Sequence, residues 1–193
     1  MRWLLNVALC SAVLCSLVLA STVHASPRDK TPAPGDRIRP QDSRSTRLLR
    51  DGMARSETFR NLVTRLEASN VFVYVQVSPF IKSTLAGQLT WMTQAGPYRY
   101  LRATISPDQT IDQAIASLAH ELQHALEVAD DEGVVSEETL VSLYKRIGQP
   151  STAAVAAGWE TIAAQETGYQ VRRELVGAAG ESIAAQLFEI AHV

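Results

Sequence analysis

Two histidines and a glutamate in the middle of the chain have the spacing needed to bind a metal ion and activate water. His120 and His124 are four residues apart, and Glu121 directly follows the first of them. On a helix, this spacing places both imidazoles on one face with Cβ atoms roughly 6 Å apart, so both can reach one zinc ion at about 2.0–2.1 Å. Glu121 can then flank the ion without binding it and accept a proton from zinc-bound water. Metal-assisted hydrolysis requires such ligands, a base and an open coordination position.

The His-Glu-x-x-His pattern is specific enough to predict a zinc site. It is expected by chance in about one of 200 chains of this composition. It also lies in a segment with its own helix signals, because Thr110 and Gln113 form a capping box and apolar residues recur at helical spacing to about Asp130. The alternative is that the two histidines only occupy the solvated side of a helix.

This segment resembles the active-site helix of the zincin superfamily of zinc metallopeptidases. The resemblance is strong over residues 118–127 and looser over the preceding strand and hairpin. It implies that His120 and His124 are zinc ligands and that Glu121 is the general base. It also implies that a hairpin strand forms the lip of the substrate cleft, with residues 98–105 as the candidate. The chain also resembles small exported bacterial proteins with an HELQH core.

Glu160 is the best candidate for a third metal ligand. It is the only charged residue between Arg146 and Glu166, and it is expected to begin a helix among small residues. A lone carboxylate in such a stretch needs a partner. The position resembles the gluzincin arrangement, in which a glutamate on a later helix completes a His, His, Glu site, although that family often has an acid where this chain has Ala164. The alternative is a carboxylate favoured by the helix dipole.

Other acids and donors near this helix have weaker claims. Asp130 is the alternative third ligand, at the metzincin position, but Glu127 stands where that branch has a glycine that lets the chain turn. Glu127 or Asp131 could instead support an imidazole as a hydrogen-bond partner, or simply be solvated. Glu166 points about 120° away from Glu160 on the same helix. Candidate donors to an oxyanion, each with a structural role as the alternative, are Tyr144, Tyr169, Arg172, Arg173 and His192.

The surrounding pattern predicts an α+β fold with a small antiparallel sheet packed on the metal helix and a helical C-terminal half that supplies the third ligand. We expect a helix from about residue 46, with a break near Gly52 and a cap at Ser56. Extended segments are expected at 71–77, 87–93 and 98–105, with a turn at 94–97. Later helices are expected at 110–130, 137–147, 159–176 and 181–193.

The N-terminal residues predict export. Residues 1–25 have a basic start, an apolar run and small residues before a cleavage site, as in a signal peptide, with an uncleaved anchor as the alternative. Residues 26–45 are rich in proline and charge and are expected to form a flexible leader, which leaves 46–193 as a single metal-binding domain. Both cysteines, Cys10 and Cys15, fall in the signal peptide, so the mature chain has no disulfide or thiolate site.

Composition limits the partners. The chain has 193 residues, 46% of them hydrophobic, and residues 66–193 carry seven basic against fifteen acidic side chains. An acidic folded part argues against nucleic acid as a partner. We therefore expect a periplasmic or secreted zinc (Zn2+) metallopeptidase that acts on peptides or proteins and is not inserted in the membrane after signal cleavage. The alternative is a non-catalytic, zinc-stabilised interaction module of the cell envelope.

Overall fold

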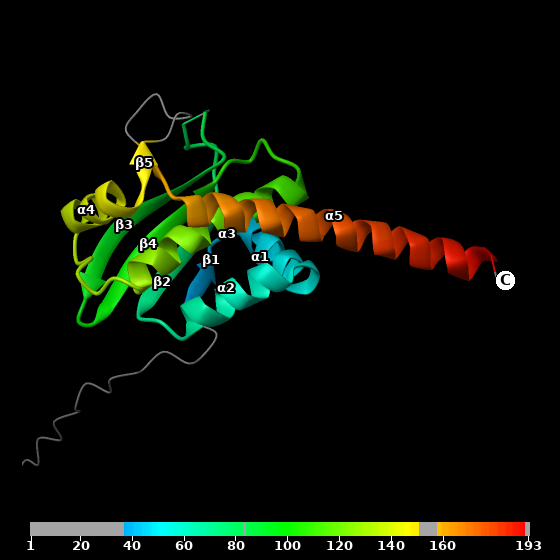
Figure 1. Ribbon diagram of the computed structural model, residues 1–193, viewed down its shortest axis with the longest axis horizontal. Helices are drawn as coiled ribbons and strands as arrows, with labels where there is room; N and C mark the ends of the chain where they lie inside the picture. The colour runs from blue at the N-terminus through cyan, green and yellow to red at the C-terminus, as the bar shows by residue number, and fades with distance from the viewer. Residues whose placement is uncertain (1–36, 83, 151–157, 192–193) are drawn as a thin grey trace, which may run out of the picture. The chain divides into compact units, whose positions relative to one another are not determined.

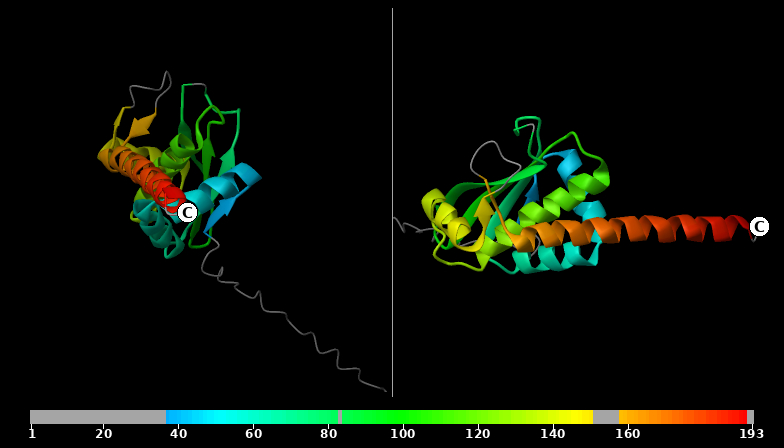
Figure 2. Two further views of the ribbon diagram at one scale, coloured as in Figure 1. Left: turned by 90° about the vertical axis from the view of Figure 1, so that its right-hand side faces the viewer. Right: turned by 45° about the horizontal axis from the view of Figure 1, so that its top comes forward.

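The computed structural model describes residues 37–82, 84–150 and 158–191, with only the backbone for residues 179–191. Helices pack on a small sheet (Figures 1 and 2), which confirms the predicted α+β class. The strands are β1 (Ile38–Pro40), β2 (Val71–Val77), β3 (Gly87–Ala95), β4 (Tyr98–Ile105), β5 (Gln149–Pro150) and β6 (Trp159–Glu160). The helices are α1 (Ser43–Arg55), α2 (Glu57–Glu67), α3 (Ile111–Ala129), α4 (Glu137–Ile147) and α5 (Ile162–Ala191).

The main sheet is mixed, so the prediction of an antiparallel sheet is wrong. Its strand order is β1-β2-β4-β3, and only the β3–β4 pair, the predicted hairpin, is antiparallel. The hairpin turn is tight because Gly96 adopts a positive φ of 57°. The sequence indicates that the two hairpin strands pair with each other, but it does not indicate which of them pairs with β2. It is β4 that does so, in parallel.

The helix α3 lies at the centre of the fold. Its N-terminus has the predicted capping box, since Thr110 accepts from Gln113 N and the Gln113 side chain accepts from Thr110 N. One side of α3 packs on β2, β3 and β4, and another side packs along α5. Alternate residues of β2 (Val71, Val73 and Val75) are fully buried beneath the helices. The sheet and α5 therefore fix α3 between them.

The first two helices meet at Ser56 and not near Gly52. Ser56 is the N-cap of α2, as predicted, and its side chain accepts from Phe59 N. Gly52 lies inside α1, where a Cβ would be only 3.0 Å from the ring of Phe59. The glycine therefore allows a close contact and does not break the helix.

The end of the predicted flexible leader belongs to the fold. Residues 38–40 form β1, which pairs in parallel with β2, and Asp42 caps α1. Asp42 also accepts a hydrogen bond from Val77 N. Backbone pairing and capping order this polar segment, although it has few apolar side chains. The remaining leader and the predicted signal peptide lie outside the described residues.

The C-terminal helical region forms one helix, α5, in place of the two predicted helices at 159–176 and 181–193. It begins only after β6, a two-residue strand that pairs with β5. None of the helices in the described part of the chain is long and apolar enough to cross a membrane.

Candidate metal centre and cleft

The helix α3 brings His120 and His124 together as the sequence predicts. Their Nε2 atoms lie 3.2 Å apart, and the two rings meet edge to face. The side chain of His124 is 7% exposed and that of His120 is 20% exposed. Both rings therefore present a nitrogen to the same partly buried point.

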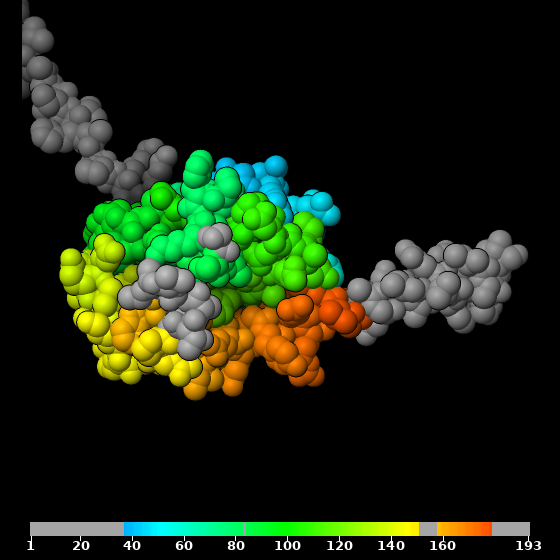
Figure 3. Space-filling view, turned by 90° about the horizontal axis from the view of Figure 1, so that it is seen from above, coloured from blue at the N-terminus to red at the C-terminus, as the bar shows by residue number. Residues whose placement is uncertain are grey.

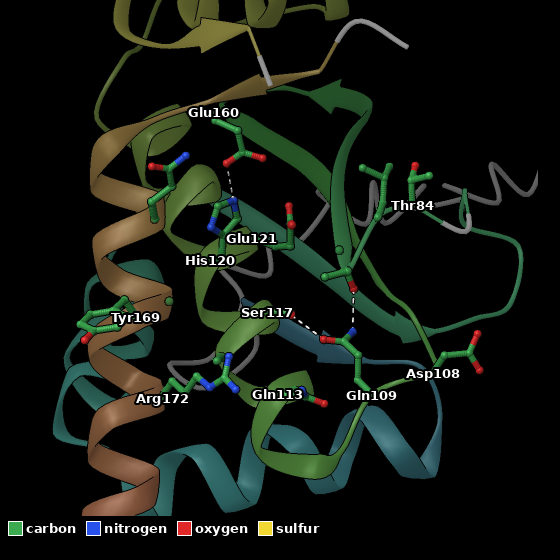
Figure 4. Close-up of a pocket in the computed structure, with 16 residues that line it drawn as sticks. Thr84, Asp108, Gln109, Gln113, Ser117, His120, Glu121, Glu160, Tyr169 and Arg172 are labelled. Atoms are coloured by element: carbon green, nitrogen blue, oxygen red, sulfur yellow. Dashed lines mark hydrogen bonds and ion pairs between the residues drawn. The ribbon is translucent and has the colours of Figure 1, made fainter. Parts of the chain in front are cut away.

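Glu160 reaches this point from β6, so it does not begin a helix as predicted. Its Oε2 lies 3.0 Å from His120 Nε2 (Figure 4). The ladder between β5 and β6 holds the residue in an extended conformation, with Glu160 opposite Gln149. At Gly148, a Cβ would be 2.9 Å from the carbonyl oxygen of Glu160, so the glycine permits this close approach.

The three side chains fit a zinc ion. Their ligand atoms all lie within 4.8 Å of one another. Two nitrogens bound at about 2.0–2.1 Å to a tetrahedral ion are about 3.3 Å apart, close to the observed separation of His120 and His124. The Oε2 of Glu160 is buried and has no hydrogen-bond partner among the described residues, although it is within ion-pair range of His120. A cation at the centre would satisfy this oxygen together with both imidazoles.

The closeness of His120 and Glu160 shifts the pKa values of both groups. Burial alone would lower the pKa of His120, but the neighbouring Glu160 and Glu121 raise it overall. Burial would raise the pKa of Glu160, yet the adjacent His120 lowers it overall. Each of the two groups therefore favours the charged form of the other.

Two neighbours orient His124. Its Nδ1 lies 2.9 Å from Glu127 Oε2, and the other oxygen of Glu127 accepts from Thr161 Oγ1 at 2.5 Å. The Tyr144 hydroxyl donates to the backbone oxygen of His124, and its ring stands edge-on to the imidazole. A carboxylate that accepts from Nδ1–H leaves the Nε2 lone pair directed at the site. Glu127 is thus the supporting partner that the sequence offered as one alternative.

Glu121 is buried beside the metal site and against β3. Burial raises its pKa, and the charges of His124 and His120 and the backbone N–H of Leu89 offset this only in part. A Cβ on Gly87 would lie 2.6 Å from Glu121 Oε1, so the glycine makes room for the carboxylate. A carboxylate with a raised pKa beside two imidazoles that could hold a metal suits a general base.

The site lies where two cavities meet. The larger has a volume of about 640 Å³, the smaller about 270 Å³, and both are lined by His120, Glu121 and Glu160. Figure 3 shows this face, with the green β3 and loop segments on one side and the yellow-orange α4 and start of α5 on the other. Apolar residues that line the smaller cavity are Leu89, Trp91, Leu140, Val141 and Trp159. Polar residues that line the larger one are Asp108, Gln109, Gln113, Ser117 and Arg172.

The edge strand β3 forms the lip of this cleft. Its residues 87–91 line the smaller cavity, whereas β4 lies inside the sheet between β2 and β3. The expectation that residues 98–105 form the lip is therefore wrong.

The alternative ligands lie elsewhere. Asp130 is exposed and forms an ion pair with Arg65 at 3.2 Å, so it is not brought to the histidines. Asp131 pairs with Arg146. Glu166 is exposed on α5 and is not part of the ligand group.

The candidate oxyanion donors are also separated by the structure. The hydroxyl of Tyr144 donates to the backbone oxygen of His124, while Tyr169 and Arg172 line the larger cavity. Arg173 lies over the ring of Tyr169, 5.9 Å from its centroid. His192 lies outside the described residues.

Three contributors to the site were not predicted. Thr161 caps α5 by accepting from Ala164 N while it donates to Glu127. A threonine directly before a helical run is a recognisable capping signal, so it could have been found. Gly87 and Gly168 act through space, since a Cβ on Gly168 would be 3.4 Å from that of His120. Such proximity has no signature in the sequence.

No protein-family model, curated protein or solved structure matches this chain. Its function therefore has to be inferred from the site itself.

Proposed function

We propose that the protein is an exported zinc-dependent hydrolase that cleaves peptide bonds. The observation that carries the proposal is the convergence of His120, His124 and Glu160 on one point, with Glu121 beside them and open to a cleft. Three protein ligands leave one position of a tetrahedral ion free, which is typical of catalytic zinc sites, whereas structural sites are closed by four. Bound zinc would supply a Lewis acid that polarises a carbonyl and lowers the pKa of water to about 7.

The residues of the chain divide the remaining work. Glu121 takes a proton from the attacking water and passes it to the leaving amine. It borders both cavities, so it can reach a substrate on either side. Glu127 keeps His124 in the tautomer and orientation needed for binding.

The edge of the sheet supports a peptide as the substrate. Among the described residues, β3 pairs only with β4, so its other backbone edge has no strand partner. An extended peptide can add to such an edge through backbone hydrogen bonds. Since Gly87 and Leu89 of β3 contact Glu121, a peptide held there would pass beside the general base. Export rests on residues 1–25, whose composition is that of a signal peptide.

Metal analysis tests the site. Mature protein purified without chelator should hold about one zinc ion per chain, and His120→Ala should abolish binding. Glu160→Ala should weaken binding by orders of magnitude, while Asp130→Ala should have little effect, in a competition titration with a chromogenic chelator. Wild-type protein that stays metal-free after incubation with zinc and desalting would remove the basis for the proposal.

Glu121→Gln tests the catalytic role. The amide keeps the size of the side chain but cannot accept the proton, so cleavage of a mixed peptide library should fall by about 10²- to 10⁴-fold with zinc content unchanged. Glu166→Gln makes the same chemical change at an exposed position and should cleave like the wild type. Mass spectrometry reads the products, and o-phenanthroline is the metal control. If the wild type and Glu121→Gln both bind zinc and neither cleaves any peptide, the zinc-stabilised interaction module becomes the better account.

A further inference from the structure

The larger cavity carries one guanidinium group. Of the residues that line it, Arg172 is the only lysine or arginine. Its side chain extends from α5 toward Gln113 and Ser117 of α3 (Figure 4). The cavity therefore offers one exposed guanidinium group to an anion on the α5 side.

Within the described part of the chain, Arg172 has no carboxylate partner. Some arginines elsewhere pair with acids, as Arg55 does with Asp112 and Arg146 with Asp131, but none of these lines the cavity. The acids that line the same cavity do not take this role. Glu121 and Glu160 belong to the metal site, and Asp108 lies on the opposite side of the cavity (Figure 4). The guanidinium is thus available to a carboxylate from outside the protein.

The position of Arg172 matches the length of a short peptide. Gly168 packs against His120, since a Cβ there would be 3.4 Å from the Cβ of the histidine. Arg172 follows four residues later, one turn or about 6 Å along the axis of α5. An extended peptide spans about 3.3 Å per residue. Because the arginine side chain adds its own reach to this rise, a group held by Arg172 would lie within a few residues of the bond at the metal site.

We propose that Arg172 binds a carboxylate of the substrate and so selects peptides that carry one within a few residues of the cleaved bond. The proposal rests on the proposed function. A planar guanidinium recognises a carboxylate through paired N–H donors, which fixes the register of the peptide as well as its charge. The carboxylate comes either from the C-terminus of the peptide or from an aspartate or glutamate side chain.

Four peptide pools separate these two sources. Each contains hexapeptides with an uncharged N-terminal BODIPY label, with a C-terminal acid or amide and with or without aspartate and glutamate. Binding is measured by fluorescence anisotropy on zinc-loaded Glu121→Gln protein, with and without Arg172→Gln. Because no turnover is needed, this result does not depend on catalysis. Cleavage of the same pools is measured with wild type, Arg172→Gln and Arg173→Gln.

A pool that offers the correct carboxylate should bind about tenfold more tightly than its neutral counterpart, and Arg172→Gln should remove the difference. A C-terminal source predicts that amidation has this effect, and a side-chain source predicts that loss of aspartate and glutamate has it. Arg173→Gln is the matched control and should cleave the pools with wild-type preference, since Arg173 lies over Tyr169.

Failure of this inference is distinguishable from failure of the proposed function. Equal binding of all four pools, or a preference that survives Arg172→Gln, would overturn the role of Arg172 even if the protein cleaves peptides. A carboxylate preference in binding without any cleavage by the wild type would support Arg172 and contradict the hydrolase.

Discussion

Adding a methyl group at Gly87 should slow hydrolysis and leave the metal ligands in place. Its Cβ would lie 2.6 Å from Glu121 Oε1 and 2.9 Å from Cγ, whereas real Cβ contacts are essentially never under 3.0 Å. The carboxylate oxygen must therefore move by at least 0.4 Å, the difference between 3.0 and 2.6 Å. Glu121 is 5% exposed and borders both cavities, so the carboxylate can move only toward them and away from its present position. A misplacement of about 1 Å can cost about 10²-fold in rate, so we expect a loss of at least about tenfold in kcat for Gly87→Ala.

The assay combines peptide cleavage, zinc titration and thermal unfolding. The three atoms nearest to the added methyl group all belong to Glu121 and none to His120, His124 or Glu160, so zinc affinity should stay close to the wild-type value. Overpacking should cost about 1–3 kcal/mol of the free energy of unfolding. Gly177→Ala is the matched control, because a Cβ there has no atom within 4 Å. Cleavage at the wild-type rate by a folded Gly87→Ala protein would refute the placement of Glu121 against this strand. Loss of zinc binding would refute the claim that Glu121 can move without disturbing the metal ligands.

Two further substitutions test the surroundings of the site. Glu127→Ala leaves the Nδ1–H of His124 without its acceptor, so zinc affinity should fall about 10- to 100-fold in a chelator competition; an unchanged affinity would show that Glu127 does not support the ligand. Burial alone would raise the pKa of Glu174, but hydrogen bonds from Ser56 and Thr58 lower it to about 2 from 4.5. A carboxyl group with a lowered pKa stabilises the fold at pH values above its pKa in the unfolded chain. This stabilisation is lost as the pH falls from about 5 to 2. Allowing for partial exposure, Glu174→Gln should cost about 1–2 kcal/mol at pH 7 and nothing near pH 2 in urea unfolding; an equal cost at both pH values would contradict the assignment.

The elements that the sequence predicts well are those fixed by neighbouring residues. The capping box at Thr110, the cap at Ser56 and the turn at Gly96 are local signals, and each lies where it was predicted. The order of the strands depends on contacts between distant segments and was not predicted. Neither was Arg99, an inward-facing residue of β4 that is 2% exposed and donates to the backbone oxygens of Val128 and Asp131 at the end of α3.

Within the site, too, local spacing predicts some features, while contacts between distant segments determine others. His120 and His124 are brought together by the pitch of one helix, so their spacing alone predicts the contact. Glu160 was identified as an isolated carboxylate in a stretch of small residues, which indicates a partner but not the backbone that presents it. That backbone is a strand, because β6 pairs with β5 before α5 begins. A two-residue strand has no periodicity from which it can be predicted.

The metal site also depends on how α5 is anchored to α3. Glu160 precedes Thr161, and Thr161 both caps α5 and donates to Glu127 on α3. Because Glu127 also contacts His124, one carboxylate links the orientation of an imidazole to the position of the segment that supplies the third ligand. Zinc would bridge the same two segments directly. Since ligands from separate segments come together only in the folded chain, the free energy of zinc binding would add to that of folding, and the proposed ion would stabilise the start of α5 on α3.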